Sequence, residues 1–382
     1  MNADTAKRIL NKCLTKDLYF QSLLEDLITT ETPPREPGSH LELINIIRKP
    51  LEEVGYLCTH YPGTISGGQL YARKPGRSNH GYQLLLGHLD TVWPFETIHD
   101  MPFTLSEDVI SGPGSYDMKA GITMMITALQ VLNDLSLEPV VKPVLFINSD
   151  EETGSHDSKV RIKRLAGVMK RVYVLEPSLD HDGKIKTRRK GIGHFSVKIK
   201  GVSSHAGLAP EKGRSAILAL SFIIQKLFNM NDPAQGITIN VGTINGGIGT
   251  NVVAPESTAA VDVRVLDEVN AQIIEQKIRS LDSSMDGISV EIEGGFGRPP
   301  MEQNQRNREL WEKAVKYGTL IGLKLDQGTS GGGSDGNFTS QITATLDGLG
   351  AVGEGAHSKN EQIYIQKTLE RTALLSLLLM AE

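Results

Sequence analysis

The sequence predicts an α/β fold with a mostly parallel sheet flanked by helices, and an α+β unit inserted into it. From Tyr56 onward, short apolar runs alternate with helical patterns, as is typical of βαβ units and a parallel sheet. Three of these runs, YQLLLG, VLFINS and VYVLE, are apolar almost throughout, as expected of strands buried on both faces. The chain of 382 residues is longer than a single core usually organises, so two domains are expected.

The N-terminal part is expected to be helical. Apolar residues recur at helical spacing over 4–29 and 38–55, and Pro33, Pro34 and Pro37 separate the two segments. These patterns predict two surface helices. Further along, the segment MKAGITMMITALQVL predicts a helix between two strands of the sheet.

The pattern changes near Arg188. The expected elements are a strand (HFSVKIKG), a helix over 215–229, two strands (GITINVGTI and STAAVDVRV), a helix over 268–281 and a strand (ISVEIEG). This order, βαββαβ, indicates a compact unit of its own, which ends at a Gly- and Pro-rich stretch over 294–300 that reads as a hinge. The predicted domains are 1–188 and 298–382, which form the first domain, and 189–297, which forms the insertion.

The last segment is expected to complete the first domain. A helix over 309–321, a Gly-rich loop, a strand near Thr343 and a final helix are predicted. The apolar run over 373–381 is too short to span a bilayer and reads as a buried helix.

Composition excludes several classes of function. The net charge is −5, and no stripe of Lys and Arg interleaved with aromatics is present, so a nucleic-acid partner is not expected. Cys13 and Cys58 form no CxxC pair, which excludes a disulfide framework and a thiolate metal site. Charges interrupt the apolar residues of the N-terminus, leaving no export signal. A cytoplasmic protein without a membrane partner is expected.

Two motifs place acids and a histidine next to predicted elements. His88 and Asp90 end the run YQLLLGHLDT, and Asp90 lies on the same side of an extended chain as His88, where a carboxylate can accept the second N–H of a metal-binding imidazole. A strand-terminal His with a capping Asp would look the same. Asp117 precedes the predicted helix, where an anion is favoured, but a simple N-cap also explains an Asp there.

Three further segments carry candidate groups. Glu151 and Glu152 lie side by side in SDEETGS, a costly arrangement unless a cation neutralises one while the other moves a proton. A solvated acidic turn is the alternative. Glu176 ends the strand VYVLE. A charged residue at this position could also simply mark the point where the strand reaches solvent. His357 lies in a Gly-rich loop that is free to reach back to the sheet, although a lone loop His is ordinarily a surface residue.

Taken together, these groups favour a metal site. Two histidines, one aspartate and two glutamates provide the nitrogen and oxygen ligands that suit zinc. Five such ligands with one bridging carboxylate suit two ions about 3.5 to 4 Å apart, which can polarise a carbonyl and bind a hydroxide. No HExxH helix is present, which excludes a single-zinc protease of that type. The hypothesis requires that five side chains meet: His88, Asp117, Glu176, His357 and one of Glu151 and Glu152.

The motifs resemble those of the co-catalytic zinc metallopeptidase family that includes glutamate carboxypeptidase, acetylornithine deacetylase, succinyl-diaminopimelate desuccinylase and aminoacylase. They occur in the family's order from about Gly87 to Glu361. The residues of GPGSYDMKAG and of the stretch from DGLG to HS are most similar to those of the glutamate carboxypeptidase branch. The motifs are GHLDTVWP, GPGSYDMKAG, SDEETGS, LEPS, SSHAGLAP, NVVAP, VDVR, GGGSDGN and GAHS. Trp93 and His156 depart from the pattern.

The resemblance implies a division of the metal ligands. His88 and Glu176 would hold one zinc ion, Glu152 and His357 the other, and Asp117 would bridge the two. The ions would be two Zn²⁺, with Co²⁺ and Mn²⁺ as alternatives. The resemblance also implies a zinc-peptidase-like fold in which the insertion is a lid and dimerisation domain.

The resemblance assigns two further roles at the metals. Asp90 would orient His88, and Glu151 would be the general base that takes a proton from the shared water and gives it to the leaving amine. It also implies a cis peptide bond between Asp117 and Met118.

Other residues are implied to contact the substrate. His205 in SSHAGLAP would stabilise the oxyanion, commonly from the partner subunit of a homodimer. Asn251 and Arg264 would bind the substrate carboxylate, a task suited to a guanidinium, although Arg264 could instead be a strand residue paired across its sheet. The Gly-rich segment would line the substrate pocket with Gly332, Gly333 and Ser334.

The function expected from this resemblance is the zinc-dependent release of a C-terminal amino acid, with glutamate foremost, from a peptide or N-acyl amino acid. A deacylase of N-acyl amino acids with the same metals is an alternative. A non-catalytic binding protein that retains the fold is an alternative of another class, and the presence of Glu151 beside all five ligands argues against it.

Overall fold

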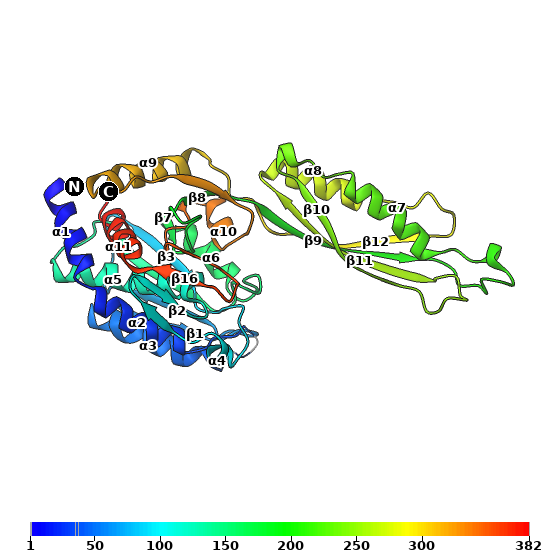
Figure 1. Cartoon of the computed structure of the whole chain (residues 1–382). Coiled ribbons are helices and arrows are strands. Elements are labelled where there is room, and N and C mark those ends of the chain that lie inside the picture. The colour runs from blue at the N-terminus through cyan, green and yellow to red at the C-terminus, as the bar shows by residue number, and fades with distance from the viewer. Residues whose placement is uncertain (1, 35, 37, 382) are drawn as a thin grey trace. The chain divides into compact units, whose positions relative to one another are not determined.

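A computed structural model of the chain describes residues 2–34, 36 and 38–381. The chain forms two compact units (Figure 1). The first consists of Met1–Thr187, Gln303–Ser330 and Ser334–Glu382, and the second of Arg188–Glu302 and Gly331–Gly333.

The first unit is built on a six-stranded sheet in the order β1-β2-β6-β3-β7-β14. Strands β6, β3, β7 and β14 are parallel, while β1 and β2 are antiparallel at one edge. The prediction of a mostly parallel sheet is therefore confirmed. Because β3 lies between β6 and β7, the segments that follow these three strands meet at one edge of the sheet. The bounds are β1 Leu57–Tyr61, β2 Gln69–Arg73, β3 Tyr82–His88, β6 Lys142–Asn148, β7 Met169–Val174 and β14 Ala344–Leu346.

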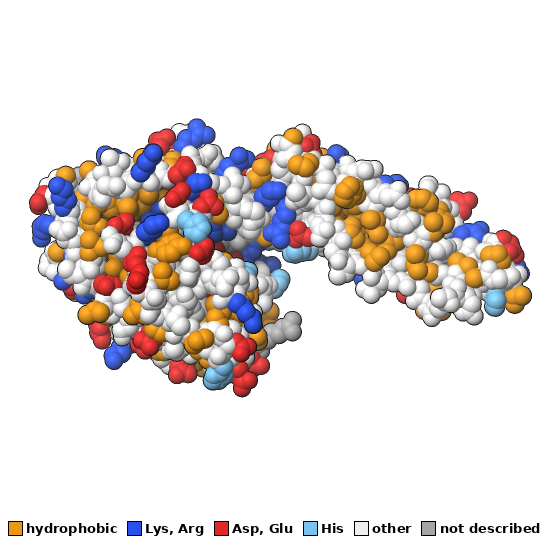
Figure 2. All heavy atoms as spheres, in the orientation of Figure 1, with side chains coloured by type: hydrophobic (Ala, Val, Ile, Leu, Met, Phe, Trp, Pro, Cys, Tyr) orange, Lys and Arg blue, Asp and Glu red, His pale blue; other side chains and the backbone are white. Residues whose placement is uncertain are grey.

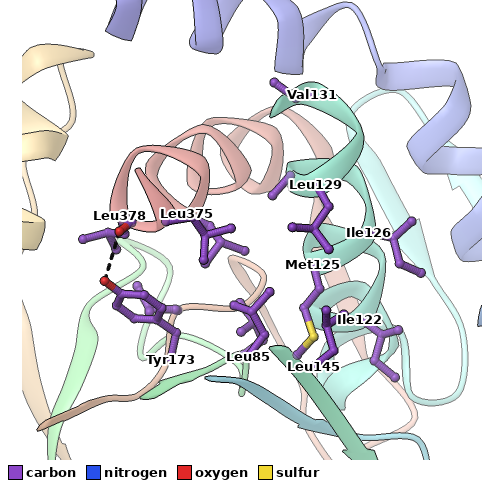
Figure 3. Close-up of a cluster of buried hydrophobic side chains, with 14 of the residues drawn as sticks. Leu85, Ile122, Met125, Ile126, Leu129, Val131, Leu145, Tyr173, Leu375 and Leu378 are labelled. Carbon is purple, nitrogen blue, oxygen red and sulfur yellow. Dashed lines mark hydrogen bonds between the residues drawn. The ribbon is translucent and has the colours of Figure 1, made fainter. Parts of the chain in front are cut away.

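Both faces of this sheet are buried. Leu85, Leu145 and Tyr173 pack on one face against α5 (Ala120–Asp134) and α11 (Ile365–Leu379), as Figure 3 shows. Alternate residues point the other way, and they pack with α6 (Lys159–Ala166) and α10 (Gly336–Ser340). This burial explains the almost continuous apolar runs of the strands.

The N-terminal helices differ from the prediction. Residues 4–29 form two helices, α1 (Ala3–Leu14) and α2 (Asp17–Thr29), so the expectation of one helix there was wrong. Thr15 ends α1, where its hydroxyl donates to the carbonyl of Lys12. No Gly or Pro marks the break, so the sequence pattern did not reveal it. The next helix, α3 (His40–Glu53), agrees with the prediction, and Pro37 lies outside the described residues.

The second unit has the predicted order βαββαβ. Its four strands form an antiparallel sheet in the order β10-β11-β9-β12. Helices α7 and α8 cover one face with an apolar core, and the other face carries ion pairs such as Lys198 with Glu293. The bounds are β9 Gly191–Lys200, α7 Ala216–Phe228, β10 Thr238–Gly246, β11 Glu256–Val265, α8 Glu268–Arg279 and β12 Ser289–Arg298.

The remaining elements are short, apart from one helix. A small sheet has the order β15-β16-β5-β4. Among the residues described, none of the helices has the length and apolar character needed to cross a bilayer. The bounds are α4 Thr97–Asp100, β4 Thr104–Ser106, β5 Val109–Ser111, β8 Ile185–Arg189, α9 Gln305–Leu320, β13 Gln327–Ser330, β15 Gly353–Glu354 and β16 Gln362–Tyr364.

Candidate metal centre

The edge of the sheet where β6, β3 and β7 end carries most of the candidate groups. His88 is the last residue of β3, Glu151 and Glu152 follow β6, and Glu176 follows β7. The three parallel strands are neighbours, so these side chains approach one another although they are far apart in the sequence.

Two other segments complete the cluster. Asp117 lies in the turn Ser115–Lys119 that precedes α5, and its peptide bond to Met118 is cis, as expected. His357 lies in the loop between β15 and β16 and has a φ of 60°. A residue other than glycine rarely adopts this left-handed conformation, and such residues are frequent at functional sites.

The structure brings all five expected metal ligands together. The Nε2 atom of His88 lies 3.2 Å from Oδ1 of Asp117 and 3.3 Å from Oε1 of Glu176. The Nε2 atom of His357 lies 3.5 Å from Oδ2 of Asp117 and 3.1 Å from Oε1 of Glu152. Asp117 therefore directs one oxygen to each histidine, and each histidine has a second carboxylate beside it.

These distances fit metal ions. Two ligand atoms that bind a tetrahedral Zn²⁺ at about 2.0 to 2.1 Å are about 3.3 Å apart, and the four separations above range from 3.1 to 3.5 Å. The imidazole nitrogens and carboxylate oxygens are also the ligand types that zinc prefers. His357 is the most exposed of the five, with 51% of its side chain accessible, so the cluster opens to solvent on that side.

The charges of the cluster are strongly coupled. Burial would lower the pKa of His88, but the carboxylates of Asp117, Asp90 and Glu176 raise it well above the usual value. The carboxylates of Asp117 and Glu152 raise the pKa of His357 to about 10. Burial raises the pKa of Glu152 to about 7. Without a cation the imidazoles thus retain protons, which metal ions would replace.

Glu151 belongs to the same cluster. A carboxylate oxygen of Glu151, a ring nitrogen of His88 and a carboxylate oxygen of Glu176 all lie within 4.8 Å of one another. A group at this distance can exchange a proton with a molecule bound between the ligands.

Asp90 connects two parts of the cluster. The Nδ1 atom of His88 lies 2.9 Å from the main-chain oxygen of Asp90 and 3.6 Å from its carboxylate. That carboxylate also accepts hydrogen bonds from the main-chain N–H groups of Glu151 and Glu152. One buried acid therefore fixes both His88 and the turn after β6, whereas the sequence had suggested only its effect on His88.

Glu361 is a second positioning residue, and the sequence did not reveal it. Its carboxylate accepts hydrogen bonds from the main-chain N–H groups of Gly114, Tyr116 and Asp117, and from Nε1 of Trp93. It therefore holds the turn that carries Asp117. The available signal was its place four residues after His357, at the end of the last motif.

The Gly-rich segment supports the cluster from inside the protein. Ser334 is fully buried and donates a hydrogen bond to Asp347. Asp335 accepts hydrogen bonds from Asn148, at the end of β6, and from Ser155. These contacts fix both ends of the turn that carries Glu151 and Glu152.

In the second unit, His205 and Asn251 lie close together. Two adjacent segments join there, since the main-chain N–H of Ala206 donates to the carbonyl of Asn251 and that of Val253 to the carbonyl of Ser204. The Nδ1 atom of His205 accepts from the N–H groups of Gly207 and Leu208. Its Nε2 atom therefore carries the proton and is a hydrogen-bond donor.

Arg264 lies at the opposite end of the same sheet. Its guanidinium forms two hydrogen bonds with the carboxylate of Asp262, two residues earlier in β11, and one with the carbonyl of Gly331. The carbonyls of Gly332 and Gly333 accept hydrogen bonds from Arg189. Between Glu256 and Arg264 the strand extends roughly 26 Å, at about 3.3 Å per residue.

Replacing Gly121 by alanine should disturb the cluster. A Cβ atom there would overlap the carbonyl oxygen of Leu175, next to Glu176. Helix α5 would have to move away from β7 and take Asp117 with it, so we expect a loss of roughly 1 to 3 kcal/mol in the free energy of unfolding and weaker metal binding. Urea unfolding and metal titration measure both. Gly297→Ala is the control, since nothing lies within 4 Å of its added Cβ atom; equal behaviour of the two variants would contradict the expectation.

Comparisons with known sequences agree with the motifs. A family model described as Peptidase family M20/M25/M40 matches residues 84–381. Carboxypeptidase G2 from Pseudomonas sp. (strain RS-16) is 27% identical over 364 residues, which are 94% of this chain and 88% of that protein. Succinyl-diaminopimelate desuccinylase from Hahella chejuensis (strain KCTC 2396) is 27% identical over 343 residues, which are 84% of this chain and 87% of that protein.

Solved structures show the same fold. Aminopeptidase PepT from Bacillus cereus ATCC 10987 has a TM-score of 0.76 at 21% identity over 98% of both chains. A dinuclear metal-binding peptidase of family M20 from Bacillus subtilis has a TM-score of 0.73 at 15% identity, over 96% of this chain and 98% of the other. With the family model, the order of the motifs and the clustered His, Asp and Glu side chains in agreement, the chain belongs to Peptidase family M20/M25/M40.

Proposed function

We propose that the chain is a two-metal carboxypeptidase that hydrolyses the amide bond before a C-terminal amino acid, with glutamate as the expected product. The observation that carries this proposal is the position of Asp117 between two histidines, each with a further carboxylate beside it. The 27% identity with carboxypeptidase G2 supports the choice of reaction within the family.

In this proposal the first unit is the catalytic domain. His88 and Glu176 would hold one ion, Glu152 and His357 would hold the other, and Asp117, which lies between the two histidines, would contribute to both. Two Zn²⁺ ions, or Co²⁺ or Mn²⁺ in their place, would supply Lewis-acid polarisation of the scissile carbonyl and lower the pKa of a water molecule.

Glu151 has the role of general base. Its carboxylate takes a proton from the attacking water as the water oxygen bonds to the carbonyl carbon. It then gives this proton to the amide nitrogen as the C–N bond breaks, so that the amine leaves in a neutral form. The closeness of Glu151 to His88 and Glu176 supports this role.

The second unit provides substrate contacts in this proposal. His205 donates from Nε2 to the oxyanion that develops on the carbonyl oxygen. Arg264 exchanges part of its contact with Asp262 for the substrate carboxylate, a partner of the same shape and charge. Asn251, which lies beside His205 at the other end of the sheet, would contact this carboxylate from the partner subunit. Gly332 and Gly333 then shape the adjacent pocket, and Ser334 holds that segment in place.

The protein acts as a homodimer in this proposal. Arg264 and His205 lie at opposite ends of one sheet, too far apart to contact the same small substrate from one chain. His205 is therefore assigned to the site of the partner subunit. The second unit also has a surface suited to such an interface, because apolar side chains gather over α7 (Figure 2), among them Ile217, Leu218, Phe222 and Phe228. Strand β10, beside α7, is an unpaired edge.

Mixing two inactive variants tests the shared site. Glu151→Gln and His205→Ala should each lower kcat by roughly 100-fold or more. In a mixed dimer, one of the two sites combines an intact Glu151 with the intact His205 of the other chain, so activity should recover to about a quarter of the wild-type value after random exchange of subunits. No recovery despite demonstrated exchange, or a sedimentation mass near the 41.6 kDa of one chain, would contradict the dimeric site.

A panel of substrates tests the reaction itself. The metal-loaded protein is assayed with folyl-glutamate, simple dipeptides and N-acyl amino acids, with and without a chelator. The proposal predicts that glutamate is released from folyl-glutamate and that the chelator abolishes this release. Metal-dependent hydrolysis of N-acyl amino acids alone would instead favour a deacylase.

The deacylase is the second candidate because the desuccinylase from Hahella chejuensis has the same 27% identity. A deacylase would use the same metal ligands with a different substrate pocket. The substrate panel is therefore the measurement that distinguishes a deacylase from a carboxypeptidase. A non-catalytic binding protein is the third candidate, and it predicts bound metal with no hydrolysis of any substrate in the panel.

A further inference from the structure

A cavity in the first unit, formed by residues other than the five expected metal ligands, has on its buried wall a guanidinium that forms no ion pair with the described residues. Its volume is about 650 Å³, which exceeds the space that one water molecule needs by more than an order of magnitude. Helix α11 and the segment between α9 and β13 form most of it. The lining residues are Asp182, Leu323, Lys324, Leu325, Asp326, Val352, Lys367, Glu370 and Arg371.

Arg371 is the unusual residue in this cavity. Only 4% of its surface is accessible, yet its guanidinium makes a single hydrogen bond, from Nη2 to the carbonyl oxygen of Gly348. The Nε atom is buried without an acceptor, and among the described residues no carboxylate forms an ion pair with it. A guanidinium has five N–H donors, so the described part of the chain uses few of them.

Such an arrangement is costly unless a ligand completes it. A buried charge without a partner is strongly unfavourable, and buried donors are nearly always satisfied. Burial lowers the pKa of Arg371 to about 10, and the neighbour that opposes this shift is Tyr116 rather than an acid. The side chain thus remains a cation at neutral pH and has no counterion among the residues that the structure describes.

The cavity carries other charges of both signs. Glu370 is half-buried, and its carboxylate accepts a hydrogen bond from Nε2 of Gln366. Lys324 and Lys367 are exposed and add positive charge. Asp182 and Asp326 are also exposed, and Asp326 accepts a hydrogen bond from the N–H of Gln327. Water screens these exposed acids, so they offset the buried guanidinium only weakly.

We propose that this cavity binds a small oxyanion, a carboxylate or a phosphate, with Arg371 as its principal ligand and Lys324 and Lys367 at its entrance. A planar guanidinium forms paired hydrogen bonds with either group. The apolar side chains of Leu325 and Val352 leave room for a short carbon chain beside a carboxylate. The site is separate from the proposed metal centre and does not depend on the proposed reaction.

Calorimetric titration of the full-length, metal-loaded protein with inorganic phosphate, and in a second series with acetate, tests the proposal in a buffer without other oxyanions. At least one of the two should bind, and the series that gives heat identifies the anion. Arg371→Met should weaken this binding by more than tenfold. The variant should fold, because it replaces an unpaired buried charge with an apolar side chain of similar length.

Three further variants make the result decisive. Lys324→Glu, at an exposed position, should weaken binding at least threefold and leave hydrolysis unchanged, whereas Lys49→Glu, an equal change of charge at another exposed position, should do neither. Asp117→Asn, which disrupts the metal centre, should retain the anion site. Three outcomes would overturn the proposal: no heat with either anion, wild-type affinity in Arg371→Met or Lys324→Glu, or loss of all binding in Asp117→Asn, which would place the anion at the metals.

Discussion

Replacing Glu151 by glutamine is expected to reduce kcat by roughly 10²- to 10⁴-fold, with the metal content unchanged. Glutamine has nearly the same shape but cannot accept a proton from water, so the group that moves the proton is lost while the metal ligands remain. Steady-state kinetics on the best substrate of the panel and metal analysis of the dialysed protein measure the two effects.

The Glu151 variant separates two roles that the geometry leaves close together. Its carboxylate lies within 4.8 Å of ligand atoms of His88 and Glu176, so a ligand role would appear as a loss of bound metal. Glu42→Gln, at an exposed position on α3, is the matched control. Activity within tenfold of the wild type would show that Glu151 is not the base.

Replacing Asp117 by asparagine is expected to remove the metal pair. Both oxygens of Asp117 face histidines, and asparagine replaces one of them with an NH₂ group that cannot bind a cation. We expect the metal content to fall from two equivalents to below one, with a loss of affinity greater than about 100-fold, since even residues behind the ligands contribute 10- to 100-fold. Hydrolysis should fall with it.

Competition with a chromogenic chelator measures the Asp117 effect. Asp134→Asn, which changes a surface aspartate paired with Lys12 and Lys16, is the control for the change of charge. Circular dichroism establishes that the fold persists. Two tightly bound metal equivalents in Asp117→Asn would rule out the bridging role.

Local pattern predicted the groups that follow strands. His88 ends one apolar strand, and Glu152 and Glu176 lie in the segments that follow two others. Parallel strands align their carboxyl ends at one edge of a sheet. Asp117 and His357 follow no such rule. Their places were expected from the resemblance of whole motifs, because a turn before a helix and a Gly-rich loop do not by themselves indicate a ligand.

Some contacts were visible in the sequence but were not used. In VDVR, Asp262 and Arg264 are two residues apart, so a strand places them on the same face. Their ion pair follows from this spacing. The prediction of a single helix over 4–29 was wrong because the sequence contains no signal for the break. The turn at Thr15 has no residue that breaks helices.

The sequence by itself determined the fold class, the order of elements in the second unit and the family, because apolar periodicity and motif order are properties of the chain alone. Only the tertiary structure decided which distant groups hold the site. Glu361 fixes the turn of Asp117, Asp335 fixes the turn after β6, and the Nε atom of Arg371 is buried without an acceptor among the described residues. Such contacts join segments far apart in the chain, and no local spacing encodes them, because packing brings the partners together.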